Sequence, residues 1–200
     1  MSKEIINISN LASVDETELV LVQSMVAELF GEPHQLVNLQ GAYFGPRRYP
    51  HTVYLSEADR FCVAILIPSH QADKLAFRVA HLSHELVHCL NPNGWPSKAT
   101  ILEEGLAEHA KVYISRVMYE GFPQLGANIQ TYGAYQEAFD RIEDLIKYEG
   151  LKGFYSGIRK LREDTCRPFA EIKAEDLKKV FLNTPVELLE LLSQPFRELD

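Results

Sequence analysis

Cysteine is scarce in this sequence, and the few cysteines lie far apart. Only three occur among the 200 residues, Cys62, Cys89 and Cys166, and none belongs to a C-x-x-C motif. An odd and scattered set argues against a disulfide framework and against a zinc ribbon. Free thiols are typical of a reducing compartment, so we expect a cytoplasmic protein.

Long apolar runs are also missing. The longest uncharged one, Phe61 to Pro68, has the length of a strand, whereas a membrane-spanning helix needs about 20 apolar residues. The first ten residues include Lys3 and Glu4 and lack the apolar core of a signal peptide. Neither membrane insertion nor export by the usual route is expected.

An excess of positive charge is absent as well. The formal net charge is −8 and the pI is near 5.4. The densest basic stretch, residues 152–167, is interrupted by Glu163 and Asp164, as on the solvated face of a helix. Nucleic-acid binding needs clustered Lys and Arg, so no nucleic-acid partner is expected.

The order of the predicted elements indicates an α+β fold in a single domain. One helix with apolar residues at helical spacing is followed by short β-rich runs, and nearly everything after Ser69 has helical periodicity. Strands that precede helices, instead of alternating with them, predict a small, largely antiparallel sheet followed by a mainly helical part. The predicted helices are 15–30, 72–90, 97–120, 131–148 and 151–163, with shorter ones from 174 and 185, and the predicted strands are 36–39, 52–56 and 61–68. The domain spans 1–200, with the first helix and the sheet in 1–70, two helices that carry chemistry in 71–120, and further helices in 121–200.

The helix 72–90 carries the pattern H-E-x-x-H, as His84-Glu85-Leu86-Val87-His88. On a helix the two histidines are about 40° apart around the axis and one turn apart along it, so both imidazoles can reach one metal ion. Leucines and valines occupy the opposite side and would anchor the helix to the core. A catalytic metal ion needs a third protein ligand and an open fourth position.

The next predicted helix supplies candidates for the third ligand. Glu104 and Glu108 lie one turn apart on one face of it, and a turn at 91–96 joins it to the first helix. If the two helices are antiparallel, this acidic face meets the two histidines.

Together the segments His84–His88 and Glu103–His109 resemble the gluzincins, the thermolysin and aminopeptidase N clan of zinc peptidases. In the aminopeptidase branch the second segment typically reads Asn-Glu-Gly-Phe-Ala-Glu-Tyr, and here it reads Glu-Glu-Gly-Leu-Ala-Glu-His. The resemblance covers the two helices and no other part of the chain. It implies a zincin-like active-site helix and one zinc ion per chain, with Glu104 as the third ligand. It further implies that Glu108 hydrogen-bonds a ligand histidine, His84, and fixes its tautomer.

The sequence departs from the family pattern at two points. The interval between His88 and Glu104 is shorter than in the aminopeptidases, and Glu103 replaces the usual asparagine, so recognition of substrate ends is not carried over. The metzincin pattern is excluded because Asn91 stands where a glycine belongs and Gly94 where a third histidine belongs.

These residues predict a zinc-dependent hydrolase that cleaves peptide bonds in a peptide or protein substrate. Zinc lowers the pKa of a bound water to about 7 and polarises the substrate carbonyl, while Glu85 moves the proton to the leaving amine. Tyr132 is the preferred stabiliser of the developing oxyanion, with Tyr135 and His109 as alternatives. His81, one turn before Glu85, would face the same cleft, although a hydrogen-bonded helix residue is the simpler interpretation.

Two other functions compete with the peptidase. In the first, the metal helices form a scaffold in a non-catalytic module that binds a protein partner; the small size of the chain motivates this alternative. In the second, the zinc ion is structural, but such a site would need a fourth protein ligand.

Overall fold

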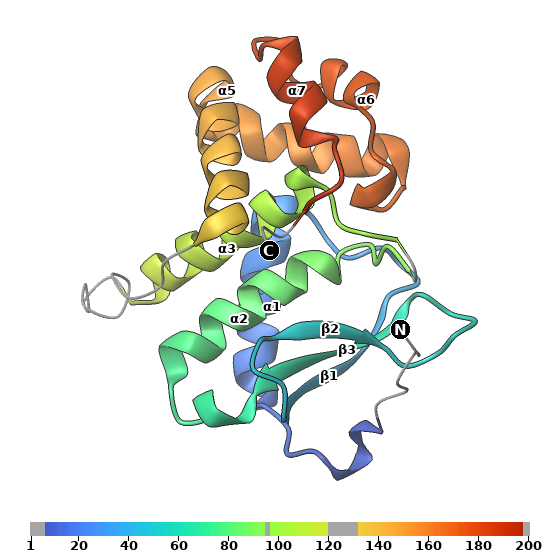
Figure 1. Cartoon of the computed structure of the whole chain (residues 1–200), viewed down its shortest axis with the longest axis vertical. Coiled ribbons are helices and arrows are strands. Elements are labelled where there is room, and N and C mark those ends of the chain that lie inside the picture. Colours follow the sequence, from blue (N-terminus) through green and yellow to red (C-terminus); the bar gives the residue numbers. More distant parts are fainter. Residues whose placement is uncertain (1–6, 95–96, 120–131, 198–200) are drawn as a thin grey trace.

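A computed structural model describes residues 7–94, 97–119 and 132–197 and shows helices on one side of a small sheet (Figure 1). The sheet lies at one end of the molecule, α5, α6 and α7 lie at the other, and α2 and α3 lie between them. The helices are α1 Glu16–Phe30, α2 Leu75–His88, α3 Ile101–Met118, α5 Gly133–Thr165, α6 Ala174–Lys178 and α7 Val186–Leu192, and the strands are β1 Asn38–Gly45, β2 His51–Tyr54 and β3 Cys62–Pro68. The described residues also form the short 3-10 helices η1 Ile8–Asn10, η2 Ser69–Gln71 and η3 Phe169–Glu171. The predicted α+β class is confirmed.

The sheet is mixed rather than largely antiparallel. Its strand order is β1-β3-β2, with β2 antiparallel to β3, as predicted for a hairpin, and β1 parallel to β3. The central position of β3 follows from its burial, which extends from Val63 to Pro68. A continuous apolar run is typical of a strand that is covered on both faces and paired on both sides. β3 therefore takes the centre, and β1 and β2 become the edges.

The face of the sheet that carries Val63, Ile65 and Ile67 belongs to the main hydrophobic core. The same core includes the apolar side of α2, from Val79 to Leu86, and α2 lies against β2 and β3. This packing fixes the opposite side of α2, which carries the two histidines, relative to the strands. The core thus determines where the metal-binding motif lies.

α2 and α3 pack along each other, and α3 packs in turn against α5. The contact between α3 and α5 is close because Gly105 has no side chain. A Cβ atom built at Gly105 would lie 2.6 Å from the carbonyl oxygen of Ala138 and 2.6 Å from Cγ1 of Ile142. α3 is therefore packed between α5 and α2 at Gly105, the residue next to Glu104.

Replacing Gly105 with alanine is expected to lower the free energy of unfolding by about 1–3 kcal/mol, the usual cost of overpacking a core. Gly153→Ala is the matched control, because a Cβ at Gly153 meets only the Cβ atom of Glu149, at 3.5 Å. That change is expected to raise stability by about 0.5–1 kcal/mol, since alanine is the better helix former. Urea unfolding of the two variants measures both effects. Equal effects would contradict the crowding between α3 and α5.

Candidate metal centre

The residues predicted to bind a metal ion converge where the end of α2 meets the beginning of α3. The Nε2 atoms of His84 and His88 are 3.3 Å apart. Oε2 of Glu104 lies 3.4 Å from Nε2 of His84 and 3.7 Å from Nε2 of His88. All three side chains are largely buried. The three ligand atoms form a compact triangle, and the group could hold a metal ion.

The dimensions of this triangle fit a zinc ion. Zn–N bonds of about 2.0–2.1 Å and Zn–O bonds of about 2.0–2.2 Å at tetrahedral angles separate two ligand atoms by about 3.3–3.5 Å. The observed separations of 3.3, 3.4 and 3.7 Å are close to this. Oε2 of Glu104 is also buried without a hydrogen-bond donor among the described residues. A buried carboxylate oxygen without a donor is costly, and a cation would satisfy it.

Each of the two histidines has a second carboxylate at its other ring nitrogen. Nδ1 of His84 donates to Oε1 of Glu108 at 2.9 Å, which is the contact that the resemblance implied. Nδ1 of His88 donates to Oε1 of Glu103 at 2.7 Å. Both nitrogens that face Glu104 are therefore Nε2 atoms, and both Nδ1 atoms are engaged outside the triangle.

The role of Glu103 as a partner of His88 was not predicted from the sequence. One signal could have indicated that its partner comes from another element. The residues three and four positions from Glu103, at 99, 100, 106 and 107, are Ala, Thr, Leu and Ala, so none supplies a positive charge at helical spacing. Glu108, by contrast, has Lys111 three residues further on, with Nζ 2.5 Å from its Oε2.

The carboxylates dominate the electrostatics of the cluster. Burial disfavours protonation of both histidines, but Glu104 and Glu108 outweigh it and raise the pKa of His84 to about 10. Glu104 and Glu103 likewise raise the pKa of His88 to about 9. Burial alone would raise the pKa of Glu104, but His88 and His84 lower it overall. The cluster therefore favours bound positive charge, which protons or a metal ion can supply.

Glu85 lies beside the triangle and is held from the sheet. It is buried, and its Oε2 accepts a hydrogen bond of 2.9 Å from Oγ1 of Thr52. Thr52 belongs to β2, which among the described residues pairs only with β3. The predicted proton carrier is thus fixed by an edge strand whose other side is unpaired within the described part of the chain.

The remaining predicted site residues lie in three different environments. His81 is half-buried, and its Nε2 donates to Oε1 of Gln71 at 2.5 Å. Burial, His84 and Lys111 lower its pKa to about 4, so it is neutral at pH 7. This contact agrees with the simpler interpretation of a hydrogen-bonded helix residue.

His109 lies between α3 and α5. Its Nδ1 donates to Glu143 at 3.1 Å, and its Nε2 accepts from the hydroxyl of Tyr155 at 2.9 Å. Phe139 and Phe154 surround the ring. Both nitrogens are therefore engaged within the helical part, which leaves neither for a substrate.

Two tyrosines near the start of α5 were candidates to stabilise an oxyanion. Tyr132 precedes the helix and is 71 % exposed. The ring of Tyr135 contacts His84 edge-on, with ring centroids 6.1 Å apart, and packs against Phe196 at 4.9 Å. Tyr135 is thus the candidate for which a contact with a proposed metal ligand is seen.

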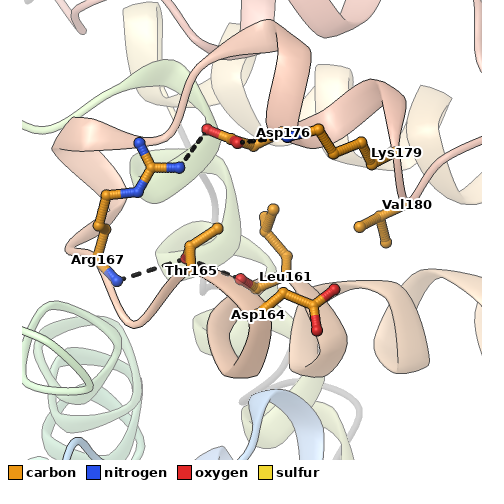
Figure 2. A pocket seen from close by; sticks show the side chains of 7 residues that line it. All are labelled: Leu161, Asp164, Thr165, Arg167, Asp176, Lys179 and Val180. Atoms are coloured by element: carbon orange, nitrogen blue, oxygen red, sulfur yellow. Dashed lines mark hydrogen bonds and ion pairs between the residues drawn. The ribbon is translucent and has the colours of Figure 1, made fainter.

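Two cavities lie outside the cluster. One, of about 320 Å³, lies between the end of α5 and α6 (Figure 2). Three of its charged side chains pair with one another, since Asp176 pairs with Arg167 at 2.6 Å and with Lys179 at 3.4 Å. Asp164 pairs with Lys160, outside the cavity, at 2.8 Å. The other, of about 370 Å³, lies where the start of α3 meets α5 and the segment around Phe196. Neither cavity contains a residue of the metal cluster.

Two further findings concern the chain as a whole. None of the described helices combines the length and the apolar character needed to cross a membrane. Comparison with known proteins finds no matching family model, no similar curated protein and no similar solved structure.

Proposed function

We propose that the protein is a zinc-dependent peptidase of the gluzincin type, with His84, His88 and Glu104 as the zinc ligands. The observation that carries the proposal is the triangle of ligand atoms, whose sides of 3.3, 3.4 and 3.7 Å suit a tetrahedral zinc ion. A closed structural site would need a fourth protein ligand. Among the described residues the group has three members, which supports an open, catalytic site.

The side chains around the triangle have separate tasks in this proposal. A bound zinc ion would supply an acidic water and polarise the carbonyl group of the substrate. Glu85 would accept the proton of that water and deliver it to the leaving amine, and Thr52 would hold Glu85 in position for both steps. Glu108 would keep His84 in the tautomer that presents Nε2 to the metal.

The edge of β2 supports a peptide as the substrate. Within the described part of the chain this edge has no partner strand, so it can pair with an extended chain through backbone hydrogen bonds, and it lies next to Glu85 through Thr52. We favour Tyr135 over Tyr132 as the side chain that stabilises the oxyanion, because Tyr135 contacts His84.

The free state of Cys62, Cys89 and Cys166 supports a reducing compartment, and we propose that the protein lies in the cytoplasm.

The test is zinc analysis combined with a peptide library. The purified chain is expected to bind one zinc ion and to cleave members of a mixed peptide library, as detected by mass spectrometry. Treatment with a chelator should stop cleavage, and added zinc should restore it. A chain that binds zinc without cleaving any peptide would favour the non-catalytic module. A chain that binds no zinc under metal-replete conditions would overturn the proposal.

A further inference from the structure

Glu103 is a buried acidic residue to which the proposed mechanism assigns no task. Its side chain is 2 % exposed, and burying a carboxylate is costly unless its oxygens are paired. Here both oxygens accept hydrogen bonds. Oε1 accepts from Nδ1 of His88 at 2.7 Å, and Oε2 accepts from Nδ2 of Asn93 at 2.7 Å. The carboxylate thus lies between a proposed metal ligand and the loop that joins α2 to α3.

We propose that Glu103 is a positioning residue that fixes the metal-binding tautomer of His88, and that Asn93 holds Glu103 in place. The inference rests on the proposed metal centre and extends it by one residue pair. A neutral imidazole carries its proton on either nitrogen, and the partner of one nitrogen decides which. With Nδ1–H donated to Glu103, the lone pair of Nε2 is free for a metal ion.

A carboxylate would perform this task more strictly than an asparagine at position 103, the residue type that the aminopeptidase pattern has there. An amide carries both an acceptor oxygen and a donor NH₂ group, so rotation by half a turn would offer a donor to Nδ1. That contact would favour the tautomer protonated on Nε2, which cannot bind a metal ion through that nitrogen. An ionised carboxylate only accepts hydrogen bonds, so it allows Nδ1–H alone.

The orientation of Asn93 is itself fixed from the helical part of the chain. Its Oδ1 accepts from the backbone N–H of Ala170 at 3.2 Å, so its NH₂ group must point toward Glu103. The neighbouring Gly94 is held as well, because its backbone N–H donates to the hydroxyl of Tyr54 at 3.0 Å. The pair Glu103–Asn93 therefore ties His88 to an anchored loop.

This arrangement predicts an unusual result for the isosteric variant Glu103→Gln. Asn93 presents a donor, so the new amide must turn its oxygen toward Asn93 and its NH₂ group toward Nδ1 of His88, which favours the wrong tautomer. Zinc affinity is expected to fall 10–100-fold, the usual cost of losing the outer partner of a metal-binding histidine. Adding Asn93→Ala to this variant should recover part of the loss, because the glutamine can then rotate. A purely structural role of the pair predicts a further loss instead.

Zinc dissociation constants are measured by competition with a chromophoric chelator, and the absorption spectrum of the Co²⁺-loaded chain reports the coordination geometry. Circular dichroism checks that each variant folds. Glu143→Gln is the matched control, since Glu143 accepts from Nδ1 of His109 outside the cluster, and its zinc affinity should stay unchanged. If the parent chain binds zinc and Glu103→Gln binds it equally well, the role of Glu103 is overturned and the metal centre stands. If the parent chain binds no zinc, the proposed function fails and this inference fails with it.

Discussion

Replacing Glu104 with alanine is expected to abolish stoichiometric zinc binding at micromolar metal concentration. The change removes one of three proposed ligands and leaves only His84 and His88 at the site. Loss of an outer hydrogen-bond partner already costs 10–100-fold in metal affinity, and loss of a direct ligand should exceed about 100-fold. Zinc content after dialysis, measured by elemental analysis, gives the result directly.

The control for this experiment is Glu163→Ala, which removes an exposed carboxylate of α5 and should leave one zinc ion bound per chain. Urea unfolding of metal-free samples shows whether either change affects the fold itself. If Glu104→Ala retains zinc at the parent affinity, the third ligand is another residue, and Glu108 would be the first candidate because it already contacts His84.

The variant Glu85→Gln is expected to keep its zinc ion and to lose peptide cleavage by about 10²–10⁴-fold, the usual contribution of a general base. Glutamine has the same shape as glutamate, and its oxygen can still accept the hydrogen bond from Thr52. It cannot take a proton from water at neutral pH. Zinc content and the rate of cleavage of a peptide identified from the library are measured on the same sample.

Retained zinc with lost cleavage would separate the task of Glu85 from those of the ligands. Glu163→Gln serves as the control for a charge change outside the site and should cleave at the parent rate. Full activity of Glu85→Gln would show that another group carries the proton, and the mechanism would then need a different base.

Local signals in the sequence were sufficient to predict most helices. The predicted helix 15–30 agrees with α1, because the side chain of Asp15 caps its first backbone N–H groups and Gly31, with φ of 88°, ends it. The two predicted helices 131–148 and 151–163 correspond to α5, which is kinked at Gly150, where φ is 69°. In both places the residue types alone determine the local backbone.

The course of β1 was harder to predict. The sequence predicted a strand at 36–39 that would end before Gly41. In the structure the strand begins later, at Asn38, and continues to Gly45 through an irregularity between Leu39 and Ala42, where Gly41 has φ of 120°. A glycine can end a strand or form a bulge within it, and pairing with β3 decides between the two. That pairing joins residues far apart in the sequence and leaves no local pattern.

The candidate site likewise combines contacts that local spacing predicts with contacts that depend on tertiary structure. His84, His88, Glu104 and Glu108 lie within 25 residues of one another and at helical spacing, so their convergence could be predicted from the sequence. Thr52 reaches Glu85 from 33 residues away in the sequence, and this contact depends on how the sheet packs against α2. The partner of Glu103 is also set by tertiary structure, because Asn93 is oriented by Ala170 in the helical part.

This difference in sequence distance has a consequence for the order of assembly. Bringing two segments together costs less loop-closure entropy when few residues separate them, so we expect the contacts between α2 and α3 to form before the contact between Thr52 and Glu85. The hairpin of α2 and α3 could therefore capture a cation while β2 is still unattached. Glu85 would acquire its partner Thr52 only when the strands dock, so a partly folded chain would lack the hydrogen bond that positions Glu85.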